Sequence, residues 1–364
     1  MRMNNVDVLL ATSPDNIYYT SHSYVLEPFT TASAVIYPVE EEPVFLVPKP
    51  EEGFIEDSIV KDKRFYGDFF IVRPIEVKSV AQDFVTSLSD ILEEKKLDKS
   101  TIGFEEKYMA YAFAEGLKHE LPNAKLKGAS AVFEEARMIK SEEEKRKIKD
   151  AVRIWESCLI EAYKKVQESQ TETEFSINLK TSIIEKGADI VFVEMGAGNR
   201  SGFPTHPSQY KMQIGDVIHV DFGITYHGYS CDMSRNAILG RETQEHIKIN
   251  NALKAGHQAA QRLLKPGAKL SDLFNSTVKA VRENGIPDYS RHHIGHGIGI
   301  PPHEPPGINP ANGRKLEPGM TLCIETPYYV STLGGFNIEN VVAITKDGCE
   351  VISQLSQDLF SLPM

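Results

Sequence analysis

Five residues in the C-terminal part of the chain have side chains that could bind divalent metal ions. They are four carboxylates and one imidazole: Asp221, Asp232, His296, Glu325 and Glu339. One ion rarely needs so many ligands, and oxygen ligands that can bridge two cations are typical of a two-metal site. The set therefore predicts metal-assisted hydrolysis.

The four carboxylates occur in two pairs, and each pair lies in a sequence that predicts a short strand hairpin. Asp221 and Asp232 lie in VIHVDFGITYHGYSCDMSR, and Glu325 and Glu339 lie in TLCIETPYYVSTLGGFNIENVV. An acid within or at the end of an apolar run should be buried, which is costly unless it is paired or binds a metal. The alternative, an edge-strand acid that faces solvent, suits a single carboxylate better than four in two matched hairpins.

Three histidines have settings that favour a functional role. His296 lies between glycines in HHIGHGIG (292–299), which allows close backbone packing, and we expect it to be a ligand. His206 and His303 each follow a proline-containing turn, and their imidazoles could donate to a substrate carbonyl or move a proton. His292 could orient a ligand or be structural. Because position 300 is Ile, the glycines do not form GxGxxG, and a dinucleotide site is not supported.

The elements that must position these residues occur in an order that repeats. Helix, helix, glycine-rich loop and ligand-bearing hairpin occupy about 141–236 and again about 242–346, and the predicted helices span 141–166, 171–187, 242–264 and 271–284. Local matches accompany this order: GFPTH (202–206) resembles GIPPH (299–303), and IGDVIHVD (214–221) resembles PGMTLCIE (318–325). A duplicated α+β unit would place the two hairpins around a pseudo-twofold axis, where the carboxylates could converge.

The remaining sequence predicts a second, smaller domain. The chain has 364 residues, enough for two domains. Residues 1–134 read as an α/β domain, with strands over 7–48 and helices over 80–96 (N-cap Ser79) and 108–121, and no concentrated set of ligands. Residues 135–364 form the ligand-bearing domain. There we expect Trp155 in the core and His227 in a hairpin turn.

Composition excludes several functional classes. The net charge of −11 gives no support for binding to nucleic acid or an anionic membrane. We expect neither a membrane span nor a signal peptide, because no stretch approaches 18 apolar residues and MRMNNVDVLL lacks a long apolar run. The four cysteines are far apart without a CxxC pair, which fits a reduced cytoplasmic protein. Cys231 adjoins Asp232, but strand neighbours point to opposite faces, so we do not expect it to be a ligand. Motifs of serine hydrolases, zincins and P-loop proteins are absent from the sequence.

These motifs together resemble the superfamily of prolidase, aminopeptidase P, creatinase and methionine aminopeptidase, whose fold is called pita-bread. The resemblance is strong over 137–364 and looser before it. It rests on the ordered Asp, Asp, His, Glu, Glu set, on GHGIG (295–299), on the His-Glu pair at 303–304 and on EPGM (317–320). It implies an α+β fold, with a duplicated pita-bread domain over 135–364 preceded by a creatinase/prolidase-type α/β domain over 1–134.

The resemblance also implies how the ligands divide between two divalent ions. Asp221 would bind one ion, His296 and Glu325 would bind the other, and Asp232 and Glu339 would bridge them. The ions would be manganese or cobalt, with zinc or iron as further possibilities that the ligand set does not separate. A water or hydroxide between the ions would be the nucleophile.

The implied reaction is hydrolysis of the peptide bond before proline in dipeptides or short peptides. Glu325 could pass the proton to the leaving amine, and His206 and His303 match the family's histidines on the substrate side. The chain would then be an Xaa-Pro dipeptidase or Xaa-Pro aminopeptidase, a homodimer located in the cytoplasm. Methionine aminopeptidase activity is disfavoured, because compact enzymes of that type lack the additional N-terminal domain.

Two departures from the pattern leave an alternative open. Many prolidase-like members carry Arg two positions before the last Glu and Asp just after it, whereas this chain has Asn337 and Asn340. The alternative is a metal-dependent C–N hydrolase of a small amide, similar to creatinase or ectoine hydrolase. A non-catalytic binding module is disfavoured because all five ligands are retained. Arg200, Arg291 and Arg314 remain candidates for holding a substrate carboxylate.

Overall fold

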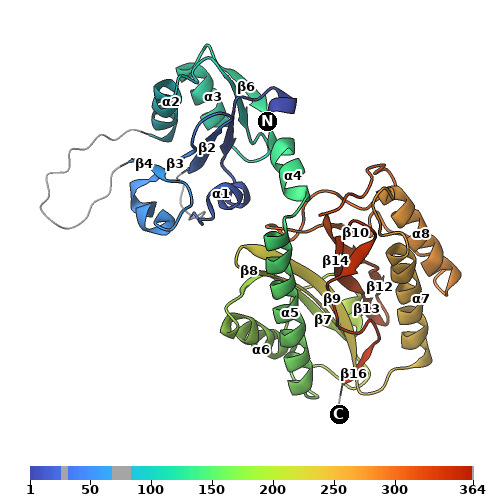
Figure 1. Cartoon of the computed structure of the whole chain (residues 1–364). Helices are drawn as coiled ribbons and strands as arrows, with labels where there is room; N and C mark the ends of the chain where they lie inside the picture. The colour runs from blue at the N-terminus through green and yellow to red at the C-terminus, as the bar shows by residue number, and fades with distance from the viewer. Residues whose placement is uncertain (26–31, 68–82, 363–364) are drawn as a thin grey trace, which may run out of the picture. The chain divides into compact units, whose positions relative to one another are not determined.

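The computed structural model describes residues 1–25, 32–67 and 83–362 (Figure 1). The chain divides into two compact units, Met1–Ala136 and Arg137–Met364, close to the expected boundary at residues 134 and 135. Among the described residues, no helix is long and apolar enough to cross a membrane.

A six-stranded mixed sheet forms the centre of the N-terminal unit, in the order β4-β3-β2-β1-β5-β6. Side chains of a strand alternate between its two faces. Val8 and Leu10 of β1 therefore pack with α2 and α3, whereas Leu9 and Ala11 pack with α1. The elements are η1 (Arg2–Asn4), β1 (Val8–Ala11), α1 (Pro14–Ser21), β2 (Ala34–Pro38), β3 (Val44–Pro48), η2 (Lys49–Ile55), β4 (Asp62–Tyr66), α2 (Phe84–Glu94), β5 (Thr101–Phe104), α3 (Tyr111–Glu120), β6 (Lys125–Gly128) and α4 (Ser130–Met138).

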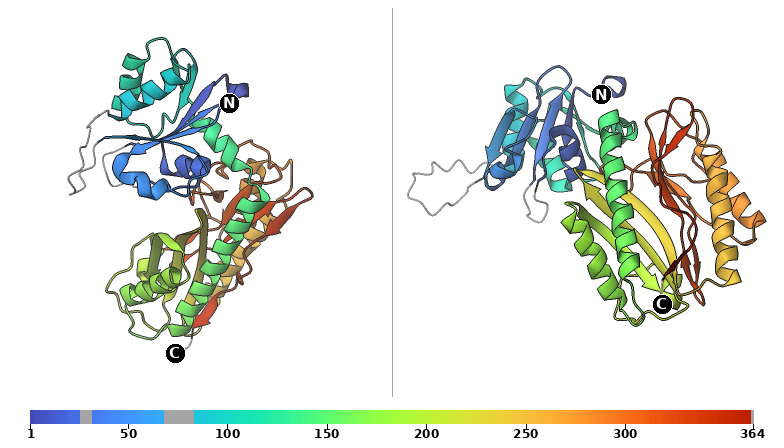
Figure 2. Two further views of the ribbon diagram at one scale, coloured as in Figure 1. Left: turned by 60° about the vertical axis from the view of Figure 1, so that its left-hand side comes forward. Right: turned by 60° about the horizontal axis from the view of Figure 1, so that its bottom comes forward.

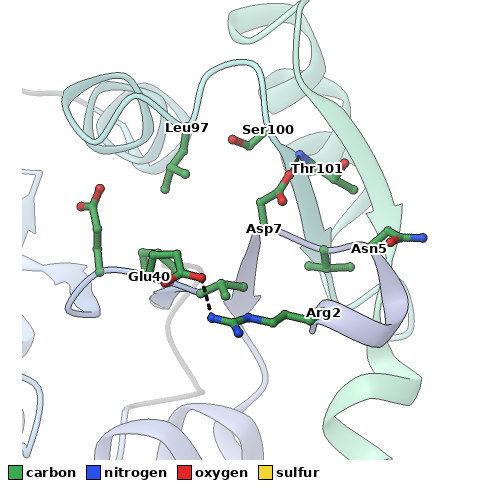
Figure 3. A pocket seen from close by; sticks show the side chains of 11 residues that line it. Arg2, Asn5, Asp7, Glu40, Leu97, Ser100 and Thr101 are labelled. Carbon is green, nitrogen blue, oxygen red and sulfur yellow. Dashed lines mark hydrogen bonds and ion pairs between the residues drawn. The ribbon is translucent and has the colours of Figure 1, made fainter.

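The start of α2 differs from the sequence expectation. Asp83 is the N-cap, and its side chain accepts a hydrogen bond from the Thr86 amide. The expected cap, Ser79, lies outside the described residues. A surface pocket of this unit is bordered by Arg2 and Glu40, which form an exposed ion pair (Figure 3). Within the described part of this unit, no three potential metal ligands lie together.

The C-terminal unit contains two four-stranded sheets and two pairs of long helices. The sheets have the orders β16-β9-β8-β7 and β10-β11-β14-β15. The elements are α5 (Glu142–Lys165), α6 (Glu172–Glu185), β7 (Asp189–Ala197), η3 (Gly198–Gly202), β8 (Val217–Tyr226), β9 (Tyr229–Leu239), α7 (Gln244–Gln261), α8 (Leu270–Glu283), β10 (Gly295–Gly297), β11 (Thr321–Glu325), β12 (Tyr328–Val330), β13 (Gly334–Phe336), β14 (Glu339–Ile344), β15 (Cys349–Val351) and β16 (Phe360–Leu362).

The helices lie outside the sheets (Figure 2). Helices α5 and α6 cover the sheet of β7, β8 and β9, and α7 and α8 lie on the side of β11 and β14. The expected repeat of helix, helix and ligand-bearing strands is present as α5–α6–β7–β8–β9 and α7–α8–β10–β11–β14. One large apolar core joins α7 and α8 to the strands that carry the second pair of acids. The strands that bear ligands are thus held rigidly from outside.

Local sequence signals explain where the first two helices of this unit begin. Ser141 and Thr171 are N-caps, and each forms the reciprocal capping box expected from its sequence, with Glu144 and Glu174 respectively. Trp155 of α5 is fully buried, stacks on Phe222, and donates its indole N–H to the Phe222 carbonyl at 2.7 Å. Its expected place in the core is confirmed.

Candidate metal centre and active site

The first pair of acids lies on the β8–β9 hairpin. The turn residues His227 and Gly228 have φ angles of 48° and 77°, typical of a two-residue hairpin turn, so the prediction for His227 is confirmed. Gly223 of β8 lies opposite Asp232 of β9. Because side chains alternate along a strand, Asp221, two residues from Gly223, projects from the same face as Asp232.

The second pair lies where β11 and β14 meet. Glu325 ends β11, Glu339 begins β14, and the two residues lie directly opposite each other in the antiparallel register. The intervening residues form a separate ribbon of β12 and β13, rather than the single hairpin expected from the sequence. This ribbon leaves the two carboxylates at the end of the sheet.

Strand β10 adds His296 beside these acids. Its partner in the register is Cys323 of β11. A side chain at Gly295 would begin 2.0 Å from the Cys323 carbonyl oxygen, and one at Gly297 would begin 2.4 Å from that of Pro305. Only glycine therefore fits on either side of His296, as the sequence suggested.

Four of the five expected ligands come together in a compact cluster. Asp221, Asp232 and Glu339 each offer an oxygen within 4.8 Å of the others. His296 Nε2 lies 3.9 Å from Asp232 Oδ2 and 3.7 Å from Glu339 Oε1. The cluster thus draws ligands from both halves of the repeated unit.

The electrostatics of the cluster fit cation binding. Burial and the neighbouring acids raise the pKa of Asp221 and of Glu339 well above the usual range. Asp232 Oδ1 is buried without a hydrogen-bond partner, and among the described residues no Lys or Arg is ion-paired with these three acids. Burial also lowers the pKa of His296, which favours the neutral, metal-binding imidazole. Buried acids with no cation of their own are suited to binding divalent ions.

The fifth expected ligand, Glu325, lies beside the cluster and contacts a histidine that the sequence reasoning did not single out. Its Oε1 lies 3.1 Å from His293 Nδ1. Burial raises the pKa of Glu325, but the hydrogen bond and charge of His293, together with the charges of His296 and Arg291, more than offset this effect and leave the pKa lowered. His292 is exposed, and its ring edge packs against His293. His293, and not His292 as considered from the sequence, is therefore the histidine that contacts a candidate ligand.

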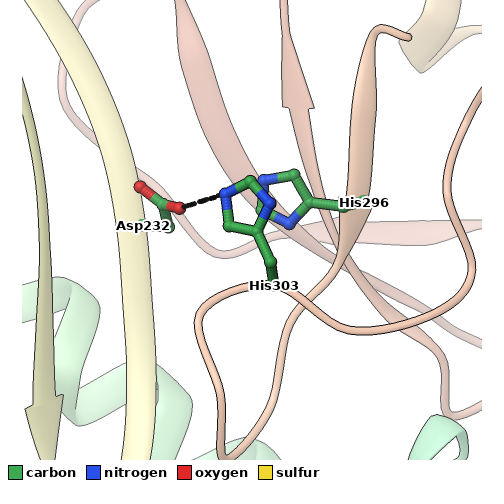
Figure 4. A group of neighbouring side chains, drawn as sticks. All are labelled: Asp232, His296 and His303. Atoms are coloured by element: carbon green, nitrogen blue, oxygen red, sulfur yellow. Dashed lines mark ion pairs between the residues drawn. The ribbon is translucent and has the colours of Figure 1, made fainter. Parts of the chain in front are cut away.

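His303 lies over the cluster (Figure 4). Its Nε2 is 3.2 Å from Asp232 Oδ2, and its ring stacks on His296 with centroids 3.5 Å apart. The side chain is 60% exposed, so a substrate could reach it. The hydrogen bond that His303 donates to the Asp232 carboxylate raises the pKa of His303.

A buried ion triad holds the loop that carries His303. The Glu304 carboxylate is paired with Arg137 at 3.1 Å and with Lys140, and all three side chains are buried. Ser230 adds hydrogen bonds to the carbonyls of residues 299 and 300 in the same loop. The loop therefore has a fixed backbone on which only the His303 side chain is exposed.

His206 lies outside the cluster. It is exposed, and its carbonyl accepts a hydrogen bond from Arg200. Arg200 in turn is ion-paired with the buried Glu172, which fixes it within the protein. No contact of the His206 ring with the cluster occurs among the described residues, so its role in substrate binding stays a prediction.

The two asparagines that depart from the expected pattern lie on different faces. The Asn337 amide donates to Asp221 Oδ2 at 3.4 Å and so touches the cluster. Asn340 instead accepts from Arg235 at 2.6 Å, on the face turned away from the cluster. Only Asn337 can influence the site directly.

Comparison with known proteins identifies the family. Residues 146–346 match the model of metallopeptidase family M24, and residues 1–139 match that of the creatinase/prolidase N-terminal domain. The chain belongs to metallopeptidase family M24. The fold and the resemblance predicted from the sequence are thereby confirmed, as is the prediction of a peptidase.

Named relatives of this M24 protein span its whole length. An Xaa-Pro dipeptidase of Pyrococcus horikoshii is 26% identical over 363 residues, covering 99% of this chain and 96% of the relative. A dipeptidase crystal structure from the same organism has a TM-score of 0.87 at 25% identity, covering 99% of this chain and 97% of that one. The X-Pro aminopeptidase of Thermotoga maritima has a TM-score of 0.86 at 24% identity, covering 99% of both chains, which shows the shared fold.

One further side chain of the M24 unit enters the cluster unexpectedly. The thiol of Cys323 lies within 4.8 Å of ligand atoms of His296 and Glu339. Cys231, the cysteine considered from the sequence, belongs to no such group among the described residues. The strand alternation that excluded Cys231 could have identified Cys323, since Cys323 lies two residues before Glu325 and shares its face.

Proposed function

We propose that this M24 protein is a dinuclear metal-dependent peptidase that cleaves the bond before proline in dipeptides or short peptides. The observation that carries the proposal is the buried cluster of acids from β8, β9 and β14, with which no Lys or Arg of the described residues is ion-paired. In this proposal Asp221, Asp232, His296, Glu325 and Glu339 hold two divalent ions, with manganese or cobalt preferred and zinc or iron as alternatives. When bound, such ions supply Lewis acidity that activates water and polarises the scissile carbonyl.

The chain's own residues would position the substrate and move protons. His303 is fixed by Asp232 and exposed on the substrate side, so it can donate a hydrogen bond to a carbonyl or tetrahedral oxygen. Glu325 is oriented by His293 and can carry a proton towards the leaving amine. His206 would contact the substrate from the first half of the unit.

The free carboxylate of a dipeptide needs a cation, and Arg291 is the best candidate. Arg200 is ion-paired with Glu172, and Arg314 with Glu317. Arg291 Nε is buried and has no hydrogen-bond partner among the residues that the structure describes, and the positive charge of Arg291 contributes to lowering the pKa of Glu325. A guanidinium near the site can bind a carboxylate through two parallel hydrogen bonds.

The alternative of a non-peptidase C–N hydrolase now rests on Asn337 alone. Asn340, the other motive for it, is hydrogen-bonded to Arg235 away from the cluster. Relatives named Xaa-Pro dipeptidase over the full length of the chain support the peptidase instead.

The test combines metal analysis with a substrate panel on one preparation. Protein loaded with Mn²⁺ or Co²⁺ should contain about two ions per chain and cleave Xaa-Pro dipeptides faster than matched Xaa-Ala dipeptides. An Xaa-Pro-Xaa tripeptide separates dipeptidase from aminopeptidase activity. Asp232→Asn, which keeps the side-chain shape, should lose both metal and cleavage. Two ions without cleavage of any prolyl peptide would overturn the proposed substrate but not the metal site.

A further inference from the structure

Cys323 lies where a metal ligand would lie, although it is not among the five ligands that the resemblance to the family implies. It lies opposite His296 in the β10–β11 register and two residues before Glu325 on β11. Both relationships put its side chain on the face that carries the cluster. Its Sγ donates to the Asp232 carbonyl at 3.4 Å, which holds the thiol against the strand bearing that ligand.

The atoms around this thiol form a mixed donor set. Sulfur of Cys323, nitrogen of His296 and oxygen of Glu339 lie within 4.8 Å of one another, and all three residues are buried. Sulfur, imidazole and carboxylate together are typical of zinc sites, whereas manganese prefers oxygen donors. The group of Asp221, Asp232 and Glu339, by contrast, offers only carboxylate oxygens.

We propose that Cys323 is a direct metal ligand, which together with His296 and Glu339 gives one of the two metal positions a preference for Zn²⁺, Co²⁺ or Cd²⁺ over Mn²⁺. The inference rests on the proposed function in so far as His296 and Glu339 are metal ligands, and at this one position it replaces the preference for manganese given there. A coordinating thiol is deprotonated by the ion itself, so binding at this position releases one proton to solvent. The second position, made of carboxylates, keeps no such preference.

Cys231 provides a matched control. Like Cys323 it is fully buried in a strand, and it directly precedes the candidate ligand Asp232. It faces the other side of β9 and belongs to none of the ligand groups of the described residues. A variant at Cys231 should therefore reproduce any general effect of removing a buried thiol but not a loss of ligation.

The experiment uses the full-length protein, stripped with a chelator and reloaded with Co²⁺. Wild type and Cys231→Ser should show a thiolate-to-cobalt charge-transfer band in the near ultraviolet, and Cys323→Ser should bind cobalt without that band. In a competition experiment, the ratio of the Zn²⁺ affinity to the Mn²⁺ affinity should fall by at least about tenfold in Cys323→Ser. Tenfold is the lower end of the loss of metal affinity that changes around a metal site cause. If Cys323→Ser does not fold, X-ray absorption on Zn²⁺-loaded wild type replaces it, with sulfur expected at about 2.3 Å.

The outcomes separate this inference from the proposed function. Cobalt bound to wild type without a charge-transfer band, or zinc without a sulfur neighbour, overturns the role of Cys323 and leaves the peptidase proposal standing. A band that disappears in Cys231→Ser but persists in Cys323→Ser also overturns it. A band lost only in Cys323→Ser supports the inference even if no prolyl peptide is cleaved. Failure of wild type to bind any cobalt overturns both proposals.

Discussion

Replacing Glu339 by glutamine should stabilise the metal-free protein while removing metal binding. Glu339 is buried against Asp221 and Asp232, and burial and these neighbouring charges raise its pKa. A carboxyl group whose pKa is raised on folding destabilises the fold at every pH above its unfolded pKa, because its charged form is disfavoured. Glutamine has the same shape without the charge, and its amide can donate to the Asp232 carboxylate.

The size of the effect has an upper limit. Two unit charges 4.8 Å apart repel by roughly 3.5 kcal/mol at an effective dielectric constant of about 20. Glu339 can avoid this repulsion by binding a proton, which at pH 7 costs about 3.4 kcal/mol for a group with an ordinary pKa of 4.5. The variant should therefore raise the free energy of unfolding by about 1–3 kcal/mol at pH 7 and by no more than about 1 kcal/mol at pH 5.

Trp155 allows the measurement to be confined to the catalytic unit. It is the only tryptophan of the chain and is fully buried beside Phe222. Urea unfolding followed by its fluorescence, with a chelator present, gives the midpoint for wild type and variant at both pH values. Glu168→Gln, at an exposed glutamate, controls for a general change in net charge.

The same measurement with metal in place of the chelator should give the opposite order of stability for wild type and Glu339→Gln. With excess Mn²⁺ or Co²⁺, wild type should become more stable than Glu339→Gln, because only a protein that binds the ion gains stability from it. A variant with an unchanged or lower midpoint in chelator at pH 7 would refute the claim that the acids repel one another. Equal stabilisation of both proteins by metal would refute the role of Glu339 as a ligand.

Three further predictions address pH dependence, catalysis and specificity. Burial lowers the pKa of His257 to about 4. Wild type should therefore lose up to about 3 kcal/mol of folding stability as the pH falls from 6.5 to 4, and His257→Gln should lack this loss in the same urea assay. Identical pH profiles of the two proteins would refute this prediction. His303→Ala should retain its metal by elemental analysis and lower kcat by roughly 10²–10⁴-fold, and full activity would exclude a role in proton transfer or oxyanion stabilisation. Arg291→Met should raise KM for Xaa-Pro dipeptides more than for their amides, whereas Lys279→Met, in the same surface pocket, should not; equal increases for acid and amide would rule out carboxylate binding.

Much of the site could be predicted because its positions follow strand alternation. Asp221 and Asp232 are brought to one face by a two-residue turn at His227 and Gly228, and the sequence contains both the acids and the turn signal. Capping boxes likewise marked where two of the long helices begin. These features depend on neighbours within about a dozen residues, where spacing alone determines direction.

Other features could not be predicted because they depend on pairing between distant segments. Strand alternation could place Cys323 on the face of Glu325, but its thiol meets His296 only through the β10–β11 register, and Glu304 meets Lys140 across more than 160 residues. His293, rather than His292, contacts Glu325 because of the exact course of the chain entering β10. Sequence spacing could place each of these residues on an element, but could not select its partner.

The placement of Arg235 shows how, in the part of the chain that the structure describes, the acids of the cluster are kept free of lysine and arginine partners. Its guanidinium is buried in the strand that also carries Asp232, close enough for its charge to act on Glu339. Yet all of its hydrogen bonds go to other acceptors: the carbonyls of residues 234, 339, 355 and 356 and the side chain of Asn340.

These five bonds use the full donor capacity of an arginine, so none remains for a carboxylate of the cluster. A fold that only had to neutralise its buried acids could have turned this cation towards them. Instead, Arg235 fastens β9 to β14 and to the segment before β16 from the opposite face. The strands that bear the acids are thereby held together, while the acids themselves stay available to ions from solution.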